Sequence, residues 1–285
     1  MKVVENCDLT EFNSYRINAI CKTAMFPADE KEMVKIFKEY PKEKLKILGS
    51  GNNIILSRKW YKETFVIIND CFNSIEVVGE TMIAESGSTL LEASKVACDY
   101  GLSGLEIFYD IPSSMGGAVV MNAGASGEEI KDVLVKVRYL DLVDNEVKEI
   151  HKENIDFSYR NSFFQKNTNK IILKAWLKLQ PKSSKLIREK MDLIRSQRWA
   201  KQPRDLPNCG SVFKRPEGYY VGKLIQDLNL KGYTVGGAKI SEKHGGFIVN
   251  FQNASGQDIL DIISHVQKLV RETYGVELEV EQRII

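Results

Sequence analysis

Hydrophobic positions recur with helical spacing in some segments of the chain and form short apolar runs in others. A strong helical pattern covers residues 257–274. Thr89 and Glu92 give a capping-box pattern at the start of another helix, which Gly101 is placed to end. Helices are predicted at Asp29–Tyr40, Thr89–Tyr100, Ser183–Ala200, Tyr219–Leu228 and Gln257–Tyr274. Strands are predicted at Lys44–Leu48, Ile54–Ser57, Thr64–Ile68, Ser74–Val78, Met82–Ala84, Val133–Leu142, Glu146–Glu149, Ile171–Leu179 and Val276–Ile284.

The pattern changes around Pro181, where strand-like runs give way to a charged helical segment. The residues expected on the buried side of this helix are Leu186, Ile187, Met191, Ile194 and Trp199. A boundary is therefore expected near residues 181–184, between a mixed α+β first part and a smaller α+β last part. The predicted domains are residues 1–180 and 181–285.

The composition excludes several classes of protein. Of the 285 residues, 43% are hydrophobic, which is enough for a folded core and excludes a disordered chain. Forty Lys and Arg residues against 38 Asp and Glu leave a net charge of +2, so neither nucleic acid nor an anionic membrane is expected as the main partner. The apolar runs are a few residues long, whereas a membrane span needs about 20. The first residues also lack the apolar core of a signal peptide, so we expect a cytoplasmic protein.

Cysteine and histidine are too scattered to predict a disulfide framework or a zinc site. The five cysteines, at positions 7, 21, 71, 98 and 209, are widely spaced and form no C-x-x-C motif, which indicates reduced thiols. The three histidines are not paired at ligand spacing, so no metal is expected. Cys209 has no nearby histidine to activate it and is predicted to be a small buried residue. We therefore expect chemistry that uses an organic cofactor or Ser, Arg and carboxylate groups.

Eight basic residues lie between Lys182 and Arg204, with only Glu189 and Asp192 as acids in their midst. Such a run could steer an anionic ligand toward the protein. A solvated helix face is the favoured interpretation, because the charged side of an amphipathic helix ordinarily faces water.

A glycine-rich turn over residues 49–53 follows a predicted strand and is similar to the start of a dinucleotide-binding fingerprint. It departs from that fingerprint in two ways. Ile54 stands where Gly or Ala is needed, and a strand follows in place of a helix. We therefore reject a Rossmann domain. A glycine turn between two strands can still collect backbone N–H groups into an anion-binding nest, and a tight hairpin without a ligand is the alternative.

A second segment, residues 101–127, holds six glycines in 27 residues. Its stretch 112–117 (Pro-Ser-Ser-Met-Gly-Gly) suits a loop that enters a short helix with free N–H groups facing a phosphate. Its stretch 122–124 (Asn-Ala-Gly) has no large side chain, so the backbone can approach a flat ring closely. A loop of this length without a ligand is uncommon. Together, the two glycine-rich segments predict a cradle for a dinucleotide outside the Rossmann scheme.

Further motifs follow in order along the chain. With the two glycine-rich segments they are Ile47-Leu48-Gly49-Ser50-Gly51-Asn52-Asn53, residues 101–127, Tyr159-Arg160-Asn161-Ser162, Gly210-Ser211-Val212-Phe213-Lys214, Gly222-Lys223-Leu224-Ile225, Leu230-Lys231-Gly232, Gly236-Gly237-Ala238-Lys239-Ile240-Ser241, His244-Gly245-Gly246-Phe247-Ile248-Val249-Asn250 and Leu278-Glu279-Val280-Glu281. Each motif alone is weak, but the ordered set resembles the UDP-N-acetylenolpyruvoylglucosamine reductase family over nearly the whole chain. The short spacing from Ser211 to Gly222 is similar to the compact form of the family, which lacks an extra substrate-covering insertion.

The resemblance implies an α+β fold. An FAD-binding domain of the vanillyl-alcohol-oxidase and p-cresol-methylhydroxylase type, with subdomains at about 1–70 and 71–180, is followed by an α+β substrate-binding domain at 181–285. It also implies a monomeric, cytoplasmic oxidoreductase of peptidoglycan synthesis, and so a role in cell-wall biogenesis, cell shape, cell division and the cell cycle. In that family NADPH reduces FAD, and the reduced flavin passes hydride from N5 to C3 of UDP-N-acetylglucosamine-enolpyruvate.

The resemblance further implies three catalytic residues. Arg160 offers a planar fork of donors to a carboxylate that gains charge. Glu281 helps to stabilise an enolate and is expected to act protonated or through a donor, because an ionised carboxylate would repel the enolate. Ser211 gives a proton to C2. Lys214 is expected to stabilise the resulting oxyanion or to hold a substrate phosphate, and Tyr159 is also expected to bind substrate. The residues assigned to the cofactor are Gly49, Ser50, Gly51, Asn52, Asn53, Ile54, Ser113, Ser114, Gly116, Gly117, Asn122, Ala123 and Gly124.

The chain departs from the family's pattern at Asp110-Ile111-Pro112-Ser113, where Gly-Ile-Pro-Gly is usual. A carboxylate at Asp110 is expected to weaken FAD binding unless it points away from the pyrophosphate. Two alternatives therefore stay open. One is a paralogous FAD oxidoreductase of the same fold acting on another nucleotide-sugar, and the other is a nucleotide-sugar-binding protein that has lost flavin. Retention of Arg160, Ser211 and Glu281 argues against the first, and Asp110 is the only support for the second.

Overall fold

The computed structural model describes residues 1–68 and 71–285, and the chain forms two compact units. Unit 1 consists of Met1–Val4, Ala24–Ser50 and Glu63–Arg198, and unit 2 consists of Glu5–Thr23, Gly51–Lys62 and Trp199–Ile285. These units interleave along the chain, whereas the predicted domains are continuous stretches, and the domain assignment stays a prediction. The predicted subdomain boundary at about residue 70 lies outside the described residues.

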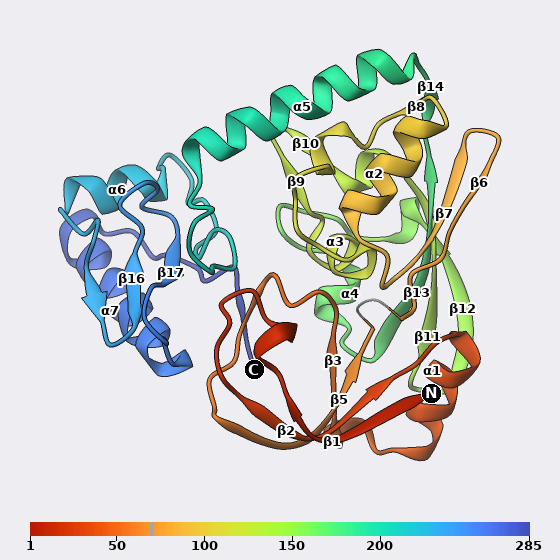
Figure 1. The fold of residues 1–285 in the computed structure, drawn as a ribbon, viewed down its shortest axis with the longest axis horizontal. Coiled ribbons are helices and arrows are strands. Elements are labelled where there is room, and N and C mark those ends of the chain that lie inside the picture. Colours follow the sequence, from red (N-terminus) through yellow and green to blue (C-terminus); the bar gives the residue numbers. More distant parts are fainter. Residues whose placement is uncertain (69–70) are drawn as a thin grey trace. The chain divides into compact units, whose positions relative to one another are not determined.

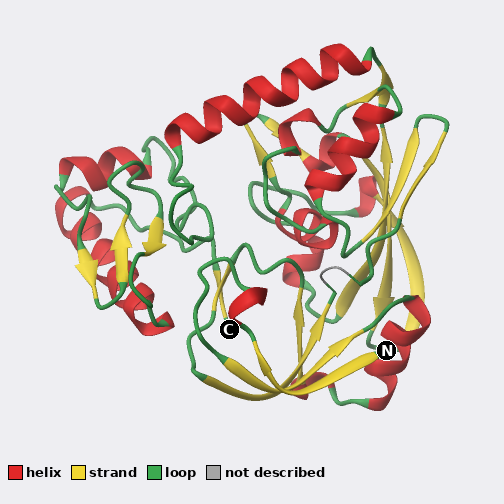
Figure 2. Ribbon diagram, viewed as in Figure 1, coloured by secondary structure: helices red, strands yellow, loops and turns green. Residues whose placement is uncertain are grey.

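The chain forms both helices and strands, which confirms the predicted α+β fold class (Figures 1 and 2). The helices are α1 (Glu30–Glu39), α2 (Leu90–Asp99), α3 (Met115–Met121), α4 (Phe163–Lys166), α5 (Ser184–Lys201), α6 (Val221–Asp227) and α7 (Gly256–Tyr274). Strands of the first hundred residues are β1 (Lys2–Asp8), β2 (Ile20–Phe26), β3 (Leu45–Leu48), β4 (Ile54–Ile55), β5 (Trp60–Ile67), β6 (Ile75–Val78) and β7 (Thr81–Glu85). Later strands are β8 (Leu102–Ser103), β9 (Gly124–Ala125), β10 (Glu128–Glu129), β11 (Leu134–Asp141), β12 (Glu146–His151), β13 (Lys170–Lys178), β14 (Gln180–Pro181), β15 (Thr234–Val235), β16 (Ala238–Ile240), β17 (Ile248–Asn250) and β18 (Arg283–Ile284).

Unit 1 is built on an antiparallel sheet with the strand order β12-β11-β13-β7-β6. Apolar side chains of α2 and α3 pack against this sheet; among those buried are Leu90, Ala93, Ala97, Met115, Ala118, Val119, Met82, Ala84, Val137, Ala175 and Leu177. Helix α2 begins with the predicted capping box. The Thr89 hydroxyl accepts from the Glu92 N–H at 3.1 Å, and the Glu92 carboxylate accepts from the Thr89 N–H at 3.1 Å.

A second apolar cluster of unit 1 holds α1, which begins at the N-cap Asp29. It contains Met33, Ile36 and Phe37 of the helix together with residues of the neighbouring strands, among them Val66. Strands β3 and β5 pair in parallel within the sheet order β1-β2-β5-β3. The glycine-rich turn thus follows the carboxyl end of β3, which is where ligands bind in many open sheets.

Unit 2 contains the three-stranded antiparallel sheet β15-β16-β17, against which α7 packs. Helix α7 begins with a capping box between Ser255 and Asp258 and ends at Gly275, whose φ of 66° is the left-handed conformation that glycine adopts readily. The residues buried on its apolar face include Ile259, Ile262, Ile263, Val266 and Val270. The last strand, β18, pairs in parallel with β4, which is the strand directly after the glycine-rich turn.

Several elements differ from the predictions. Strands β1 and β2 were not predicted from the sequence. The helix predicted over 183–200 is present as α5, and Ile187 and Met191 are buried, but Leu186 and Trp199 are 51% and 49% exposed. The strand predicted over 276–284 is reduced to β18 and an isolated bridge at Val280, because most of this segment follows the neighbouring chain without a continuous ladder.

Candidate functional site

In unit 1, the first half of the glycine-rich turn contacts the loop that enters α3. The Ser50 hydroxyl accepts a hydrogen bond of 2.9 Å from the N–H of Ser114. A Cβ atom at Gly49 would lie 2.5 Å from the Ser114 Oγ, so a residue without a side chain permits this close approach. Two segments that the sequence assigned to one cofactor therefore lie side by side.

The first N–H groups of α3 already have partners within the chain, so the prediction of free donors facing a phosphate is wrong. The Gly116 N–H donates to the Ser86 carbonyl at 2.9 Å, and the N–H of the preceding residue donates to the Ser88 carbonyl at 2.7 Å. The next N–H, of Gly117, donates to the Ser114 hydroxyl at 3.3 Å. Carbonyl groups of residues 86–88 thus occupy positions at which an anion binds other helix N-termini.

The Asn122–Gly124 segment leaves α3 through a left-handed residue. Asn122 has a φ of 45°, and its side-chain N–H₂ donates to the Ser158 carbonyl at 3.1 Å. A Cβ at Gly124 would lie 2.3 Å from the backbone oxygen of Glu128. The missing side chain at Gly124 therefore allows β9 and β10 to pair, while the predicted approach to a flat ring stays a prediction.

Arg160 lies at the tip of a tight turn in unit 1. Ser158 and Asn161 exchange two backbone hydrogen bonds of 3.1 Å, and Arg160 takes the left-handed φ of 52° that such a turn needs at its second central position. The guanidinium donates to the Gly124 carbonyl at 2.8 Å and lies 5.0 Å from the centre of the Tyr159 ring. The predicted catalytic residue Arg160 thus contacts both the predicted substrate-binding residue Tyr159 and the predicted cofactor segment.

In unit 2, the segments that carry Ser211 and Glu281 run beside each other. The Glu281 N–H donates to the Val212 carbonyl at 2.8 Å, and Phe213 and Val280 form an isolated β-bridge. Ser211 is exposed and Glu281 is half-buried. The fold therefore brings together two of the three predicted catalytic positions, although they are far apart in the sequence. Arg160, the third, belongs to unit 1.

Gln282 is a buried residue of this site that the sequence reasoning missed. Its side-chain N–H₂ donates to the Cys209 carbonyl at 3.1 Å and lies within 3.3 Å of the Ser211 carbonyl. Its side-chain oxygen accepts from the Tyr15 hydroxyl at 2.9 Å, and burial raises the pKa of that phenol. The burial of Gln282 could have been predicted, because residues 278, 280 and 282 share one side of an extended chain and the first two are apolar.

The second half of the glycine-rich turn belongs to unit 2 and contacts the Glu281 segment. The Asn53 side-chain N–H₂ donates to the Glu281 carbonyl at 3.2 Å, and the Asn52 side chain accepts from the Ser14 hydroxyl. Gly51 has a φ of 67°, and a Cβ there would lie 2.0 Å from the Phe12 carbonyl oxygen. The turn is therefore fixed by contacts that only glycine allows at this position.

Three other side chains near Ser211 have defined surroundings. The Lys214 ammonium, 16% exposed, bonds to the Glu279 carboxylate at 2.6 Å. Cys209 is buried, which confirms the predicted small buried residue, and burial raises the pKa of its thiol to about 12. Burial also lowers the pKa of His244, whose Nδ1 accepts from the Gly246 N–H at 3.1 Å.

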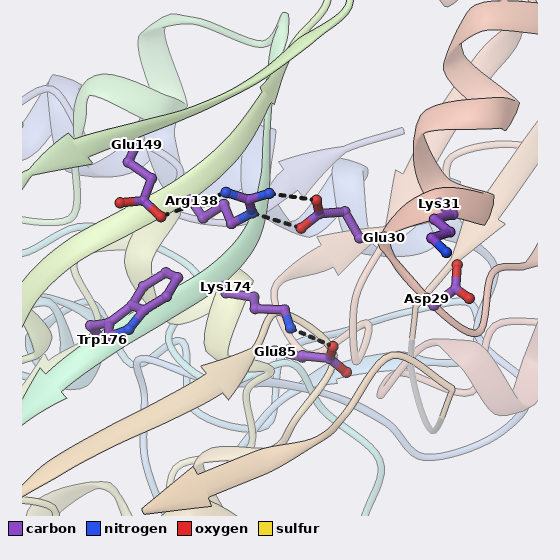
Figure 3. A pocket seen from close by; sticks show the side chains of 8 residues that line it. All are labelled: Asp29, Glu30, Lys31, Glu85, Arg138, Glu149, Lys174 and Trp176. Atoms are coloured by element: carbon purple, nitrogen blue, oxygen red, sulfur yellow. Dashed lines mark hydrogen bonds and ion pairs between the residues drawn. The ribbon is translucent and has the colours of Figure 1, made fainter. Parts of the chain in front are cut away.

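A surface hollow of about 480 Å³ in unit 1 contains none of the predicted site residues (Figure 3). Its lining residues are Asp29, Glu30, Lys31, Glu85, Arg138, Glu149, Lys174 and Trp176. Arg138 donates two hydrogen bonds of 2.8 Å to Glu30 and lies 3.6 Å from Glu149, and Lys174 lies 3.2 Å from Glu85. These charges satisfy one another, and they tie α1 to the sheet.

Outside residues 69–70, no group of three His, Cys, Asp or Glu side chains is arranged to hold a metal ion. Within the described part of the chain, no helix has the combined length and apolar character needed to cross a bilayer.

The contacts in unit 1 fit a cofactor that is bound along glycine-containing loops. At Gly49 and Gly116 a Cβ would lie under 3.0 Å from Ser114 and Ser86, respectively, so the three segments approach closely and in fixed positions. Because the first N–H groups of α3 are already bonded, the hydroxyl groups of the neighbouring serines are the candidate phosphate donors. The residues present are therefore compatible with FAD, held more by side chains than by a helix N-terminus.

Comparisons with known proteins agree with this description of the chain. The FAD binding domain family matches residues 22–151, and the family described as UDP-N-acetylenolpyruvoylglucosamine reductase, C-terminal domain, matches residues 202–285. A UDP-N-acetylenolpyruvoylglucosamine reductase from Caldanaerobacter subterraneus subsp. tengcongensis is 41% identical, and the alignment covers 100% of this chain and 94% of that protein. The reductase of the same name from Francisella tularensis subsp. tularensis is 39% identical, with 99% of each protein covered.

A solved structure extends the similarity to three dimensions. The crystal structure of the UDP-N-acetylenolpyruvylglucosamine reductase from Thermus caldophilus superposes with a TM-score of 0.84 at 28% identity, covering 99% of this chain and 98% of that one. The similarity therefore includes both ends of the chain and the glycine-rich segments between them. Since relatives about 40% identical align along its whole length, the chain belongs to the UDP-N-acetylenolpyruvoylglucosamine reductase family.

Proposed function

We propose that this protein is an NADPH-dependent flavoenzyme that reduces UDP-N-acetylglucosamine-enolpyruvate to UDP-N-acetylmuramate. The observation that carries the proposal is the full-length similarity to reductases that bear this activity in their name, together with the FAD binding domain match. The reaction belongs to peptidoglycan precursor synthesis, and so to cell-wall biogenesis and cell division. We further propose that the protein acts in the cytoplasm as a monomer.

When bound, FAD would supply the hydride chemistry that links NADPH, through the flavin N5, to C3 of the enolpyruvyl group. The residues proposed to hold FAD are Gly49, Ser50, Gly51, Asn52, Asn53, Ile54, Ser113, Ser114, Gly116, Gly117, Asn122, Ala123 and Gly124. Support comes from the contacts that join Ser50 to Ser114 and from the close approaches at Gly49 and Gly51. The hydroxyls of Ser50 and Ser114, which only accept hydrogen bonds within the described part of the chain, would donate to phosphate oxygens, whereas that of Ser113 would first have to leave the Ser114 carbonyl, to which it donates at 3.0 Å.

Arg160 is proposed to bind the substrate carboxylate as it gains negative charge. A guanidinium suits this role because it stays protonated and presents a planar fork of donors. Its bond to the Gly124 carbonyl limits the rotation of the group before substrate binds, so less conformational entropy is lost on binding. Tyr159, whose ring lies 5.0 Å from the guanidinium carbon, is assigned to the substrate together with Arg160.

Ser211 is proposed to give a proton from its hydroxyl to C2 of the substrate, and Glu281 to stabilise the enolate from which C2 accepts that proton. A serine hydroxyl is a weak acid, so the departing oxyanion needs a nearby donor or cation. Lys214 is assigned to that role or to a substrate phosphate. Its ammonium bonds to Glu279, so either role requires the lysine to exchange or share that carboxylate.

The proposal is tested by measuring NADPH oxidation by the purified protein, with and without UDP-N-acetylglucosamine-enolpyruvate. The reaction is followed by the absorbance of the reduced nicotinamide at about 340 nm. We expect a yellow protein whose oxidation of NADPH depends on the substrate. A yellow protein that oxidises NADPH only with another nucleotide-sugar would support the paralogue instead. A colourless protein that binds the nucleotide-sugar but no flavin would support the binding protein that has lost its cofactor.

A further inference from the structure

Asp110 stands where the family usually has glycine, and the structure gives its carboxylate a cationic partner. The Arg198 Nε donates to the Asp110 Oδ2 at 3.1 Å, and the Arg198 Nη2 lies 3.4 Å from the Asp110 backbone oxygen. The Asp110 side chain is 9% exposed and that of Arg198 is 20% exposed. The pair is therefore mostly shielded from water, and its electrostatic interaction is stronger than that of a surface ion pair.

Helix α5, which carries Arg198, also holds the residue that precedes Asp110. The Tyr109 ring packs in an apolar cluster with Ile187 and Met191 of α5, and with Cys98 of α2. The Arg195 guanidinium lies 5.5 Å from the centre of that ring, and its Nη1 donates to the Tyr109 hydroxyl at 3.3 Å. Figure 1 shows α5 running alongside α2. The favoured interpretation of the basic run as a solvated helix face is therefore wrong for these two arginines, because they bind residues 109 and 110.

The segment that α5 holds leads directly into the proposed phosphate-binding loop. Asp110 is followed by the loop residues 111–113 and then by Ser114, which is the N-cap of α3 and donates its N–H to the Ser50 hydroxyl. The N–H of Ile111 donates to the Phe108 carbonyl at 3.0 Å, so the main chain on both sides of Asp110 is ordered by hydrogen bonds. A displacement of Asp110 would thus be transmitted over a few bonds to the loop.

We propose that Arg198 is a positioning residue for the flavin pyrophosphate. By binding Asp110 it turns that carboxylate toward α5 and offsets its negative charge, so an acidic residue is compatible with a doubly charged ligand on the adjoining loop. The inference rests on the proposed function, which assigns FAD to this loop. It explains why the departure from glycine at position 110 does not abolish a flavin site.

The test is a titration of the apoprotein with FAD, followed by flavin fluorescence at low and at high salt. At low salt, Arg198→Gln is expected to weaken FAD binding roughly tenfold, because a carboxylate next to the pyrophosphate loses its partner cation. Asp110→Asn is expected to bind FAD within about twofold of wild type, and the Asp110→Asn, Arg198→Gln double variant within about threefold. Arg198→Lys is expected to keep most of the affinity, and high salt to reduce the effect of Arg198→Gln.

The matched control is Arg188→Gln, also on α5, whose guanidinium pairs at 3.4 Å with the exposed Asp99. It is expected to leave FAD affinity unchanged at both salt concentrations. A double variant as weak as Arg198→Gln, or an effect of Arg198→Gln that does not depend on salt, would overturn the inference by assigning the loss to structure or to direct phosphate contact. Normal FAD binding by Arg198→Gln would overturn it as well. A wild-type protein that binds no FAD would instead overturn the proposed function.

Discussion

Replacing Gln282 with leucine removes the amide that joins the Ser211 segment to the C-terminal segment of unit 2. The side chain is 4% exposed and its partners, Tyr15 and the main chain at Cys209, are 0% and 3% exposed. Leucine has a similar size, so the change leaves little cavity. It deprives the Tyr15 hydroxyl of its acceptor at 2.9 Å and the Cys209 carbonyl of its donor at 3.1 Å. Each unsatisfied buried group costs about 1–3 kcal/mol, so we expect Gln282→Leu to lower the free energy of unfolding by about 2–5 kcal/mol.

The assay is urea unfolding of the apoprotein followed by circular dichroism, with Gln226→Leu on the exposed surface of α6 as the matched control. Adding Tyr15→Phe to Gln282→Leu removes one of the two unsatisfied groups and is expected to restore about 1–2 kcal/mol. A loss below about 0.5 kcal/mol for Gln282→Leu would refute the reasoning, since surface substitutions cost that much. A double variant no more stable than Gln282→Leu would refute the assignment of the cost to the Tyr15 hydroxyl.

Three further predictions concern the proposed acid, the glycine-rich turn and a buried ion pair. Ser211→Ala is expected to block reoxidation of reduced flavin by substrate while NADPH still reduces FAD; stopped-flow absorbance separates the two steps, and loss of both together would exclude the proton-donor role. Gly51→Ala is expected to cost about 2–4 kcal/mol in urea unfolding, because its φ is 67° and a Cβ would lie 2.0 Å from a carbonyl oxygen, whereas Gly79→Ala, with a φ of 59° and nothing within 4 Å, is expected to cost about 1 kcal/mol. Equal costs would argue against the close contact. The ammonium of Lys170 holds the pKa of Asp141 in the folded protein well below its usual range. This lowered pKa stabilises the folded protein at pH values above the pKa of the unfolded chain, about 4, and the stabilisation is lost as the pH falls toward the folded pKa. Asp141→Asn should therefore lower the Tm at neutral pH and differ progressively less from wild type below about pH 4, and a difference that stays constant in acid would contradict this.

The elements with local signals were predictable from the sequence. Thr89 with Glu92 set the start of α2, and the apolar spacing of residues 257–274 with Gly275 after it set α7. Strands β1 and β2 have no regular alternation, since β1 buries only Cys7, and they depend on pairing partners elsewhere in the chain. Leu186 fits the apolar spacing of α5 but is exposed. The spacing of apolar residues does not show how much of a helix face the rest of the protein covers.

The candidate site was predictable as a list of segments and not as a set of contacts. The pairing of Val212 with Glu281 joins distant parts of the sequence, and no local pattern reports such a contact. The donors of α3 illustrate a different limit. A glycine-rich loop before a helix predicts free N–H groups only when no other part of the chain supplies acceptors, and here residues 86–88 supply them. The partner of the Asp110 carboxylate was equally unpredictable, because Arg198, which donates to it, lies far along the chain.

The internal bonding of α3 has a practical consequence for work with this enzyme. Since carbonyls of the chain itself satisfy the first turn, the loop does not depend on a ligand to complete its hydrogen bonds. Stripping the flavin should then leave this part of the protein in its folded form. We therefore expect synthetic flavins with altered reduction potentials to exchange into this loop without a refolding step, which would make the redox chemistry adjustable independently of the protein.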